Sequence, residues 1–501
     1  MRRIRKVTLI EPRPPGYHVY SLFPLPRLGL PILGAILRNK GIEVSIYCQD
    51  FHPIDYDEVL SSDLVGISTT TSTAPEAYRI ADRVRQAGIP VVFGGSHVTF
   101  SSNEALEHGD YCVRGEGEHT MVELVDALES GEEGLTDIKG LSFRAGDEVI
   151  HNEDRGRVRD LDSLPFPDLS LIKGSERINI SPVQTSRGCP FDCSFCSVTG
   201  MFGRACRYRS IESVVDEMLT REQKLTFFYD DNFVANPKRT KALLELMMSK
   251  GLTKPWSAQI RADVVHDREL MRLFQQSNCW VVYVGFESAD EETLKEYNKR
   301  ETVEQMAEAV RVLHEHGIIV HGMFVLGAEN DTTQSIRKTV QFAIKHQIDT
   351  VQFMTLTPLP GTVYYHELER QDRLLTRDWQ LYDGHHVVYE PREISPYELQ
   401  REAFRAMKCF YSIRECIRML IGPDSFKFLA KLNLNLLKGK WKRARWEIER
   451  RARKWAYSAY GHILIRRVEK ANREWTQALA RVPQRIRESL KPTQGKAEDN
   501  A

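Results

Sequence analysis

The first 150 residues alternate short apolar runs with longer amphipathic stretches. The apolar runs, which are typical of buried strands, lie at residues 7–10, 44–47, 64–68, 91–93 and 111–113. The stretches between them have helical spacing and lie at residues 28–40, 74–87, 104–108 and 118–128. This alternation predicts a doubly wound parallel sheet over residues 1–150, and two further runs, 139–143 and 149–152, predict a small hairpin.

A second alternating series follows a charged, proline-dotted stretch, residues 151–182, which predicts a linker. Its expected strands are residues 179–185, 225–229, 256–260, 280–285, 318–325 and 350–356. Its expected helices are residues 211–220, 237–249, 268–276, 303–316 and 333–346. Six such units predict a partial (β/α)6 barrel over residues 183–371, with its function at the carboxyl ends of the strands.

The pattern turns helical over residues 372–490, and residues 491–501 predict a disordered tail. Residues 426–475 hold four of the seven tryptophans. Between Lys438 and Lys470, twelve Lys or Arg oppose three Glu, a local charge of +9. An apolar stripe recurs near helical spacing at Trp441, Ile448, Ala452, Trp455 and Ala459. Contact with a membrane surface, packing against the body and, least favoured, binding of nucleic acid all fit this pattern.

Composition narrows the class of protein. The chain of 501 residues is 42% hydrophobic and 28% charged, as in an ordinary globular protein of two or three domains. A net charge of zero argues against binding of nucleic acid by the protein as a whole. The basic start is followed by an apolar run too short for a signal peptide, and no apolar run has transmembrane length. We therefore expect a cytoplasmic protein, with residues 426–475 as a route to peripheral contact at the inner face of the membrane.

Three of the nine cysteines, Cys189, Cys193 and Cys196, lie within eight residues after the first barrel strand. Soft sulfur ligands so close together bind iron–sulfur clusters, zinc or copper. A [4Fe–4S] cluster usually takes four cysteines, so three leave one iron open to a chelating cosubstrate. A zinc site and a fourth ligand at Cys206 stay open as alternatives, whereas odd, irregular cysteine spacing disfavours disulfides.

The cysteine loop resembles the signature of the radical S-adenosylmethionine (radical SAM) superfamily, on Cys189, Cys193 and Cys196. The resemblance implies that these cysteines hold a [4Fe–4S] cluster whose open iron chelates S-adenosylmethionine. An electron from a reductant such as flavodoxin or ferredoxin would then yield a 5′-deoxyadenosyl radical. That radical would abstract hydrogen from an unactivated carbon.

Polar and small residues follow the expected barrel strands, and the resemblance makes them candidate cosubstrate ligands. Adjacent carboxylates at Asp230 and Asp231 are costly after an apolar strand unless they face a pocket or water. The implied positions near S-adenosylmethionine are Phe195, Asp231, Gln259, Arg261, Glu287, Ser288, Gly322, Gly327 and Thr357. Asp231 is expected near the amino group, the next four near the carboxylate and ribose, and the glycines with Thr357 beside the adenine. No residue is assigned to the catalytic step itself.

The N-terminal half resembles the Rossmann-like cobalamin-binding domain that often precedes a radical SAM domain, on residues 28–35, 93–99 and 113–118. The expected contacts, at the carboxyl ends of two strands, are Thr69, Thr70, Thr71, Gly94, Gly95 and Ser96. The Asp-x-His-x-x-Gly motif, whose His ligates cobalt in many such domains, does not appear after the first strand, where His18 stands alone. Cobalamin bound without a protein ligand to cobalt and loss of the cofactor both stay open.

The two resemblances together imply cobalamin-dependent methylation of an unreactive carbon. The layout of the whole chain resembles the hopanoid methylases and related lipid-modifying members, so a lipid or secondary metabolite is the expected substrate. Radical coupling or cyclisation of a lipid without cobalamin is the alternative. A tRNA methylthiotransferase would need a second cysteine trio in the N-terminal half, which has only Cys48 and Cys112. A non-catalytic cobalamin-binding module would need no cysteine trio at all.

Overall fold

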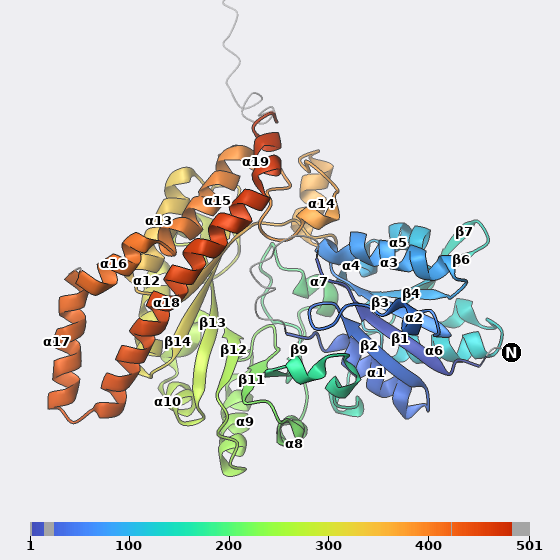
Figure 1. The fold of residues 1–501 in the computed structure, drawn as a ribbon, viewed down its shortest axis with the longest axis horizontal. Coiled ribbons are helices and arrows are strands. Elements are labelled where there is room, and N and C mark those ends of the chain that lie inside the picture. The colour runs from blue at the N-terminus through green and yellow to red at the C-terminus, as the bar shows by residue number, and fades with distance from the viewer. Residues whose placement is uncertain (1–2, 15–24, 422, 483–501) are drawn as a thin grey trace, which may run out of the picture.

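The computed structural model describes residues 3–14, 25–421 and 423–482 as two α/β units side by side with a helical C-terminal region beside the second (Figure 1). His18 and the expected tail at 491–501 lie outside the described residues. Among the helices that the structure describes, none is long and apolar enough to cross a membrane.

The N-terminal unit is a seven-stranded sheet in the order β2-β1-β3-β4-β5-β6-β7. Its five parallel strands are β1 (Lys6–Glu11), β2 (Glu43–Cys48), β3 (Leu64–Thr69), β4 (Val91–Gly95) and β5 (Tyr111–Val113). The predicted hairpin, β6 (Leu141–Ala145) and β7 (Glu148–His151), extends the sheet in antiparallel fashion. The helices are α1 (Gly29–Asn39), α2 (Tyr56–Val59), α3 (Ala74–Gln86), α4 (Ser96–Phe100), α5 (Ser102–His108) and α6 (Glu118–Glu129). Apolar cores on both faces confirm the doubly wound sheet.

The second unit is the predicted six-stranded parallel sheet, with its strands paired in chain order. They are β8 (Ile180–Val183), β11 (Leu225–Phe228), β12 (Trp256–Ile260), β13 (Cys279–Glu287), β14 (Ile319–Leu326) and β15 (Thr350–Thr355). The helices that follow are α8 (Ile211–Thr220), α9 (Pro237–Ser249), α10 (Arg268–Gln276), α11 (Glu291–Glu296), α12 (Val303–Glu315), α13 (Thr333–Lys345) and α14 (Val363–Arg370). Alternate strand residues are buried against these helices, and the others line the inside of the partial barrel.

The stretch expected as a linker packs closely on the N-terminal sheet. It forms short turns of 3-10 helix, and Leu169, Ile172 and Ile178 are buried in the apolar core on one face of the N-terminal sheet. Ile172 also forms a single parallel bridge with Ile46 of β2. The stretch ends inside the second sheet, because β8 begins at Ile180, before the expected boundary at 182.

The C-terminal region covers the open edge of β15 with α15 (Pro396–Phe410), α16 (Ile413–Ile421), α17 (Pro423–Leu437), α18 (Trp441–Ala471) and α19 (Arg473–Leu479). The Tyr411 hydroxyl donates to the carbonyl of Val351 at 2.7 Å and accepts its N–H at 2.8 Å. These contacts satisfy backbone groups at the edge of β15. The segment before α15 reaches the other unit, where the Trp379 indole donates to Glu104 of α5 at 2.8 Å.

Replacing Tyr411 with Phe should destabilise the protein by about 1–3 kcal/mol, since it removes both contacts of a buried hydroxyl and leaves edge groups of β15 without their partner. The measurement is urea unfolding of the full chain. Tyr460→Phe, on the exposed face of α18, is the matched control and should change little. Equal midpoints for the two variants would show that the edge contact contributes nothing.

Candidate functional site

The cysteine loop is closed at its base by a short antiparallel pair that the sequence pattern did not reveal. β9 (Ser186–Arg187) pairs with β10 (Arg207–Tyr208), and α7 (Val198–Phe202) lies within the loop. Gly188, with φ of 92°, follows β9, and a Cβ there would stand 2.9 Å from the carbonyl oxygen of Ala205. The strand pair therefore needs glycine at this position to bring the two ends of the loop together.

The three thiols of this loop are half-buried and close enough to influence one another's ionisation. Burial raises the pKa of Cys189 and Cys193, and that of Cys196 to about 12. Iron would have to displace these protons on binding. Within the described residues, no three His, Cys, Asp or Glu side chains are placed to hold a single metal ion. A cluster takes one thiolate per iron, so its ligands need not converge on one point, and this donor set fits it.

Cys206, the alternative fourth ligand, lies at the base of the loop. Its thiol donates to the carbonyl oxygen of Gly188 at 3.2 Å, and burial raises its pKa. Its position beside β9 and β10 gives this thiol a role in closing the loop.

The two aspartates after β11 have different surroundings. Asp230 is fully buried and accepts hydrogen bonds from Thr185 and Ser186, so it joins the end of β11 to the strand before the cysteine loop. Burial raises the pKa of Asp230 to about 6, although these hydrogen bonds oppose the shift. Asp231 is half-buried and accepts the N–H of Gly188 at 3.2 Å. Asp231 therefore faces the cysteine loop, whereas Asp230 is structural.

A buried group of four charges lies beneath the cysteine loop. Arg261 pairs with Glu301 at 3.2 Å, and Lys299 pairs with Glu287 at 3.1 Å and with Glu301 at 3.9 Å. The Arg261 guanidinium also stacks on Phe191 of the loop, 3.9 Å from the ring centre. Burial disfavours the charge on Lys299, but Glu287 and Glu301 outweigh it and raise its pKa. Two of the four members, Lys299 and Glu301, were not among the predicted residues.

Strained backbone at the end of β13 holds Glu287 in this group. Glu287 has φ of 62°, where non-glycine residues are uncommon, and the pairing of β13 with β14 shifts register beside it. A Cβ on the preceding Gly285 would stand 2.6 Å from the Glu287 carboxylate. The Gly285-Phe286-Glu287 sequence thus permits a turn that directs the carboxylate to Lys299.

The other predicted residues divide between the mouth of the barrel and its outer layer. Phe195 packs edge-on against Tyr297 at 4.8 Å, and Gln259 lies on the inner face of β12. The Thr357 hydroxyl donates to the carbonyl oxygen of Thr355, just beyond β15. Gly327, with φ of 106°, follows β14, and its carbonyl oxygen accepts a hydrogen bond from the hydroxyl of Tyr389.

Two predicted residues face the helices instead of the barrel interior. The Ser288 hydroxyl is buried within 3.4 Å of that of Thr339 in α13. A Cβ on Gly322 would contact Phe324 and Ile348 of the core, because even-numbered residues of β14 point outward. The two-residue alternation of β14 places Gly322 on its helix-facing side, and the cosubstrate contacts expected at Ser288 and Gly322 stay predictions.

The inner face of the barrel is lined by aromatic rings that the sequence analysis did not single out. Tyr283 of β13 lies 5.7 Å from Phe227 of β11 and 5.0 Å from His321 of β14, between ring centres. Burial lowers the pKa of His321 to about 4, so the ring is neutral at pH 7. These rings occupy alternate positions of the strands in the sequence. They could be assigned to the inside of the barrel only after the structure showed which alternate set faces inward.

The residues expected to contact cobalamin meet at the carboxyl ends of β3 and β4. The Thr69 hydroxyl donates to the carbonyl of Gly94 at 3.0 Å, and a Cβ on Gly95 would collide with Thr69 at 2.3 Å. Thr70 and Thr71 enter a 3-10 turn, and Ser96, expected in a loop, begins α4. A Cβ on Gly94 would meet only a carbonyl oxygen at 3.9 Å, so a ligand can approach the backbone of β4 closely at this position.

A buried ion-pair group joins this edge of the first unit to the cysteine loop. Glu116, just after β5, pairs with Arg187 of β9 at 3.1 Å and with Arg207 of β10 at 2.7 Å. Burial alone would raise the pKa of Glu116, but Arg207 and Arg187 hold it below its usual value. Arg187 also pairs with Glu118 at 2.7 Å. We call Glu116, Glu118, Arg187 and Arg207 the interdomain clamp.

An aromatic contact lies near the same junction. The ring of Phe100, at the end of α4, lies 3.4 Å from where a Cβ on Gly200 of α7 would stand. A Cβ on Gly361, after β15, would stand 2.4 Å from the same ring. Small residues in the second unit thus admit Phe100, and the two sheets meet at their carboxyl ends.

Replacing Lys299 with Met should destabilise the protein by about 3–5 kcal/mol, because it leaves Glu287 and Glu301 buried without a shared cation. Urea unfolding of the full chain measures the loss. Lys295→Met, on the exposed side of the neighbouring α11, is the control and should be near neutral. A Lys299 variant as stable as this control would show that the charge group is not needed for folding.

Comparison with known families agrees with this arrangement. A model described as the radical SAM superfamily matches residues 183–343, and one described as a B12 binding domain matches residues 19–125. The first implies a [4Fe–4S] cluster and S-adenosylmethionine, and the second implies cobalamin, which confirms the predicted cofactors. A solved structure of OxsB, a cobalamin-dependent S-adenosylmethionine radical enzyme, has the same fold, with a TM-score of 0.65 and 16% identity over 95% of this chain and 84% of that one.

The similar curated proteins include methyltransferases and anaerobic magnesium-protoporphyrin IX monomethyl ester cyclases. An uncharacterized methyltransferase of Pyrococcus horikoshii is 31% identical over 77% of this chain and 88% of its own length. Bacteriochlorophyllide d C-12(1)-methyltransferase of Chlorobaculum tepidum is 31% identical over 75% and 82%. Hopanoid C-3 methylase of Methylococcus capsulatus, of the group that the sequence resembled, is 26% identical over 87% and 86%. The chain therefore belongs to the radical SAM superfamily, among the members that carry a B12-binding domain ahead of the radical SAM domain.

Proposed function

We propose that this chain is a cobalamin-dependent radical SAM enzyme that methylates an unactivated carbon of a hydrophobic small molecule. The observation that carries the proposal is the interdomain clamp, in which Glu116 binds Arg187 and Arg207. A substrate carbon has to be reached both by the adenosyl radical and by the methyl donor, and the clamp holds the two corresponding sites against each other. When bound, the cluster supplies the electron that cleaves S-adenosylmethionine, and the corrinoid supplies the methyl group.

The residues of the barrel mouth have distinct roles in this proposal. Cys189, Cys193 and Cys196 hold the cluster with one thiolate per iron. Asp231 accepts the ammonium group of S-adenosylmethionine, since its carboxylate faces the cysteine loop. Further contacts come from Phe195, Gln259, Arg261, Glu287, Gly327 and Thr357. Ser288 and Gly322 lie on the outer side, and we assign them to packing.

The corrinoid lies at the open carboxyl edge of the first sheet in this proposal. Thr70, Thr71, Gly94 and Ser96 border it, while Thr69 and Gly95 set the close approach of β3 to β4.

The lining of the barrel supports a hydrophobic substrate. Aromatic and thioether side chains point inward beside polar ones such as Gln259 and His321, namely Phe227, Tyr229, Tyr283, Met323 and Met354. Such a surface binds a flat or polycyclic apolar molecule through area and stacking. Two relatives are named for methylation of a bacteriochlorophyllide and of a hopanoid, which agrees with a lipid or a secondary metabolite of this kind.

The partners of the reaction follow from the same chemistry. The cluster needs a one-electron donor, for which we propose a flavodoxin or a ferredoxin. A cytoplasmic location with peripheral contact at the inner face of the membrane, through residues 426–475, would bring the enzyme to a lipid substrate.

The decisive experiment is anaerobic reconstitution of the full chain, with assays for cluster absorbance, 5′-deoxyadenosine, bound corrinoid and methyl transfer. Each of Cys189→Ala, Cys193→Ala and Cys196→Ala should lose the intact cluster and all deoxyadenosine, since a cluster needs its thiolate ligands. Cys206→Ala, the matched control, should keep both.

Other outcomes would redirect the proposal. Formation of deoxyadenosine without bound corrinoid would contradict methylation and favour radical coupling or cyclisation as the reaction. An intact cluster with neither product would leave only a binding role.

Asp231→Asn should weaken binding of S-adenosylmethionine by about tenfold while the cluster stays intact, since it removes one charge-assisted contact to an ammonium group. Equilibrium dialysis on the reconstituted protein measures the affinity. Asp230→Asn is the contrasting variant, because this carboxylate supports the loop from within the core, and it should lower stability. Unchanged affinity in Asp231→Asn would remove this residue from the cosubstrate site.

A further inference from the structure

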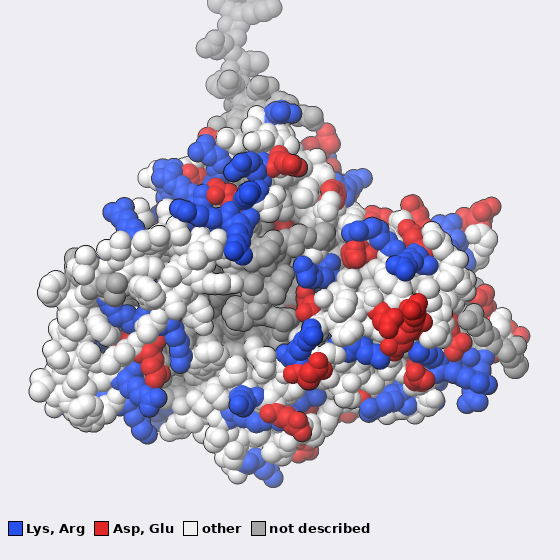
Figure 2. All heavy atoms as spheres, in the orientation of Figure 1, with Lys and Arg blue, Asp and Glu red and all other residues white. Residues whose placement is uncertain are grey.

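The outer surface of α16, α17 and α18 is unusually apolar. Of 17 large hydrophobic residues that are exposed in the described chain, 13 fall between residues 413 and 463. On the face shown in Figure 2, the lobe that holds these helices in Figure 1 carries few charged side chains over much of its surface. An apolar area of this extent on a protein surface indicates an interaction site.

The stripe predicted from the sequence of α18 points away from the body of the protein. Trp441, Ile448 and Trp455 are 68%, 50% and 43% exposed, and Ile463 continues the same face. The other two tryptophans of the region pack inward, with Trp446 beside His314 and the Trp475 indole donating to the carbonyl of Val387. Packing of the stripe against the body is therefore excluded.

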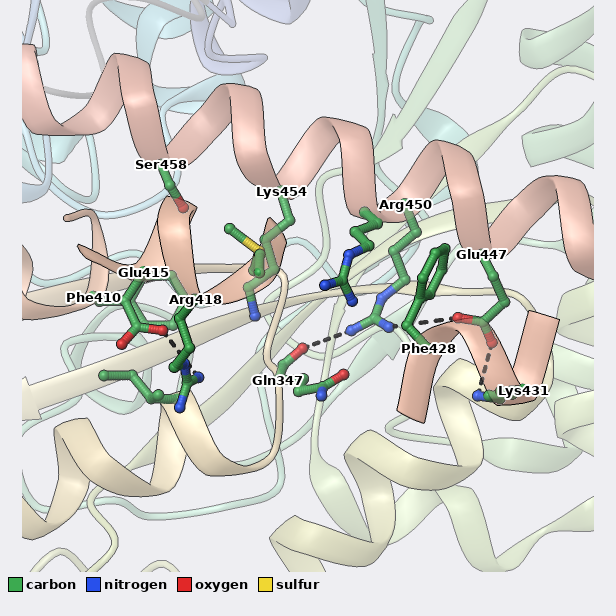
Figure 3. Close-up of a pocket in the computed structure, with 13 residues that line it drawn as sticks. Gln347, Phe410, Glu415, Arg418, Phe428, Lys431, Glu447, Arg450, Lys454 and Ser458 are labelled. Carbon is green, nitrogen blue, oxygen red and sulfur yellow. Dashed lines mark hydrogen bonds and ion pairs between the residues drawn. The ribbon is translucent and has the colours of Figure 1, made fainter. Parts of the chain in front are cut away.

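Four charged side chains of α18 line a cavity of about 270 Å³ that the helix forms with α16, α17 and the end of α13, namely Glu447, Arg450, Arg451 and Lys454 (Figure 3). Glu447 pairs with Lys431 of α17 at 2.8 Å, and the Arg450 guanidinium donates to the carbonyl of Gln347 at 2.7 Å. The Lys454 ammonium donates to the carbonyl of Ile348 at 2.7 Å. Part of the charge of α18 is thus turned inward while several of its large apolar residues are exposed to solvent, unlike a helix whose apolar face packs on the body.

Basic residues flank the exposed apolar surface at the turn between α17 and α18. Leu437 and Trp441 are 86% and 68% exposed, and Lys438, Lys440 and Lys442 beside them are exposed as well. Tryptophan with flanking lysines is the composition that places a helix in the headgroup layer of an anionic bilayer. A partner protein would not require this combination of lysines and an outward apolar stripe.

We propose that α16, α17 and α18 form a docking surface for an anionic phospholipid bilayer, in which the apolar stripe enters the headgroup layer and the lysines of the α17–α18 turn bind lipid phosphates. The surface does not depend on the reaction proposed above. It would hold the protein at a membrane whether or not the chain transfers a methyl group.

The test is sedimentation of the full chain with vesicles, without cosubstrate. Wild-type protein should bind vesicles of mixed phosphatidylglycerol and phosphatidylcholine, and bind phosphatidylcholine alone far less, with binding that falls as salt rises. Trp441→Ser combined with Trp455→Ser should weaken binding by at least about tenfold, since loss of one buried large apolar side chain is worth a decade of affinity. Leu219→Ser, an exposed leucine on α8, is the matched control and should bind as the wild type does.

A charge variant separates the two parts of the proposal. Replacing Lys438, Lys440 and Lys442 by Gln should remove the preference for phosphatidylglycerol and the salt dependence while the fold is kept, as the thermal midpoint would show. No binding by the wild type, or equal binding by the stripe variant, would overturn the proposal. So would a dimer of the wild type that the stripe substitutions convert to a monomer, because a second copy of the chain would then cover this surface.

Discussion

The interdomain clamp is the interaction on which the arrangement of this protein depends. Glu116, Arg187 and Arg207 are all withdrawn from solvent, where an ion pair is stable only if its geometry is good and its remaining polar atoms are satisfied. Both carboxylate oxygens are used, and Glu116 also accepts the N–H of Val158 at 2.7 Å. Because Arg187 and Arg207 lie on β9 and β10, the two strands that close the cysteine loop, the contact fixes the loop and the junction of the two units at once.

A second set of buried charges lies beneath the loop and holds the loop against the mouth of the barrel. Arg261 stacks on Phe191 of the loop and binds Glu301, and Lys299 balances Glu301 and Glu287. Each carboxylate has a cation near it, so the group is neutral as a whole, and removing any member would leave a buried charge unbalanced. The left-handed backbone of Glu287 persists because these contacts over-determine it.

The elements of both sheets could be predicted because strands and helices alternate with clear periods, and the cysteine trio could be predicted because its spacing is local. The clamp could not, since its partners lie 71 and 91 residues apart and nothing local marks Glu116 as a partner of Arg187. Lys299 and Glu301 were missed because they lie in the connection after α11, and nothing local shows that they pair with residues at the ends of β12 and β13. Gly322 was expected beside the adenine because a glycine near a strand end can admit a ligand, and the side of β14 on which it lies could not be known from the sequence.

The sequence predicted the apolar stripe of α18, but it could not predict which side of the helix faces the body of the protein. The helix is held by polar partners of the barrel, since Asp349 pairs with Arg450 and the carbonyls of Gln347 and Ile348 accept from Arg450 and Lys454. These groups precede β15 and need donors, so they decide which face of α18 turns inward. Because these hydrogen bonds turn the side of α18 that carries Arg450 and Lys454 inward, Trp441, Ile448 and Trp455 are exposed to water, which is unfavourable for apolar side chains. The contacts that satisfy Asp349 and the two carbonyl groups before β15 therefore also leave the apolar residues of α18 exposed. A bilayer that covers these residues would remove their unfavourable contact with water.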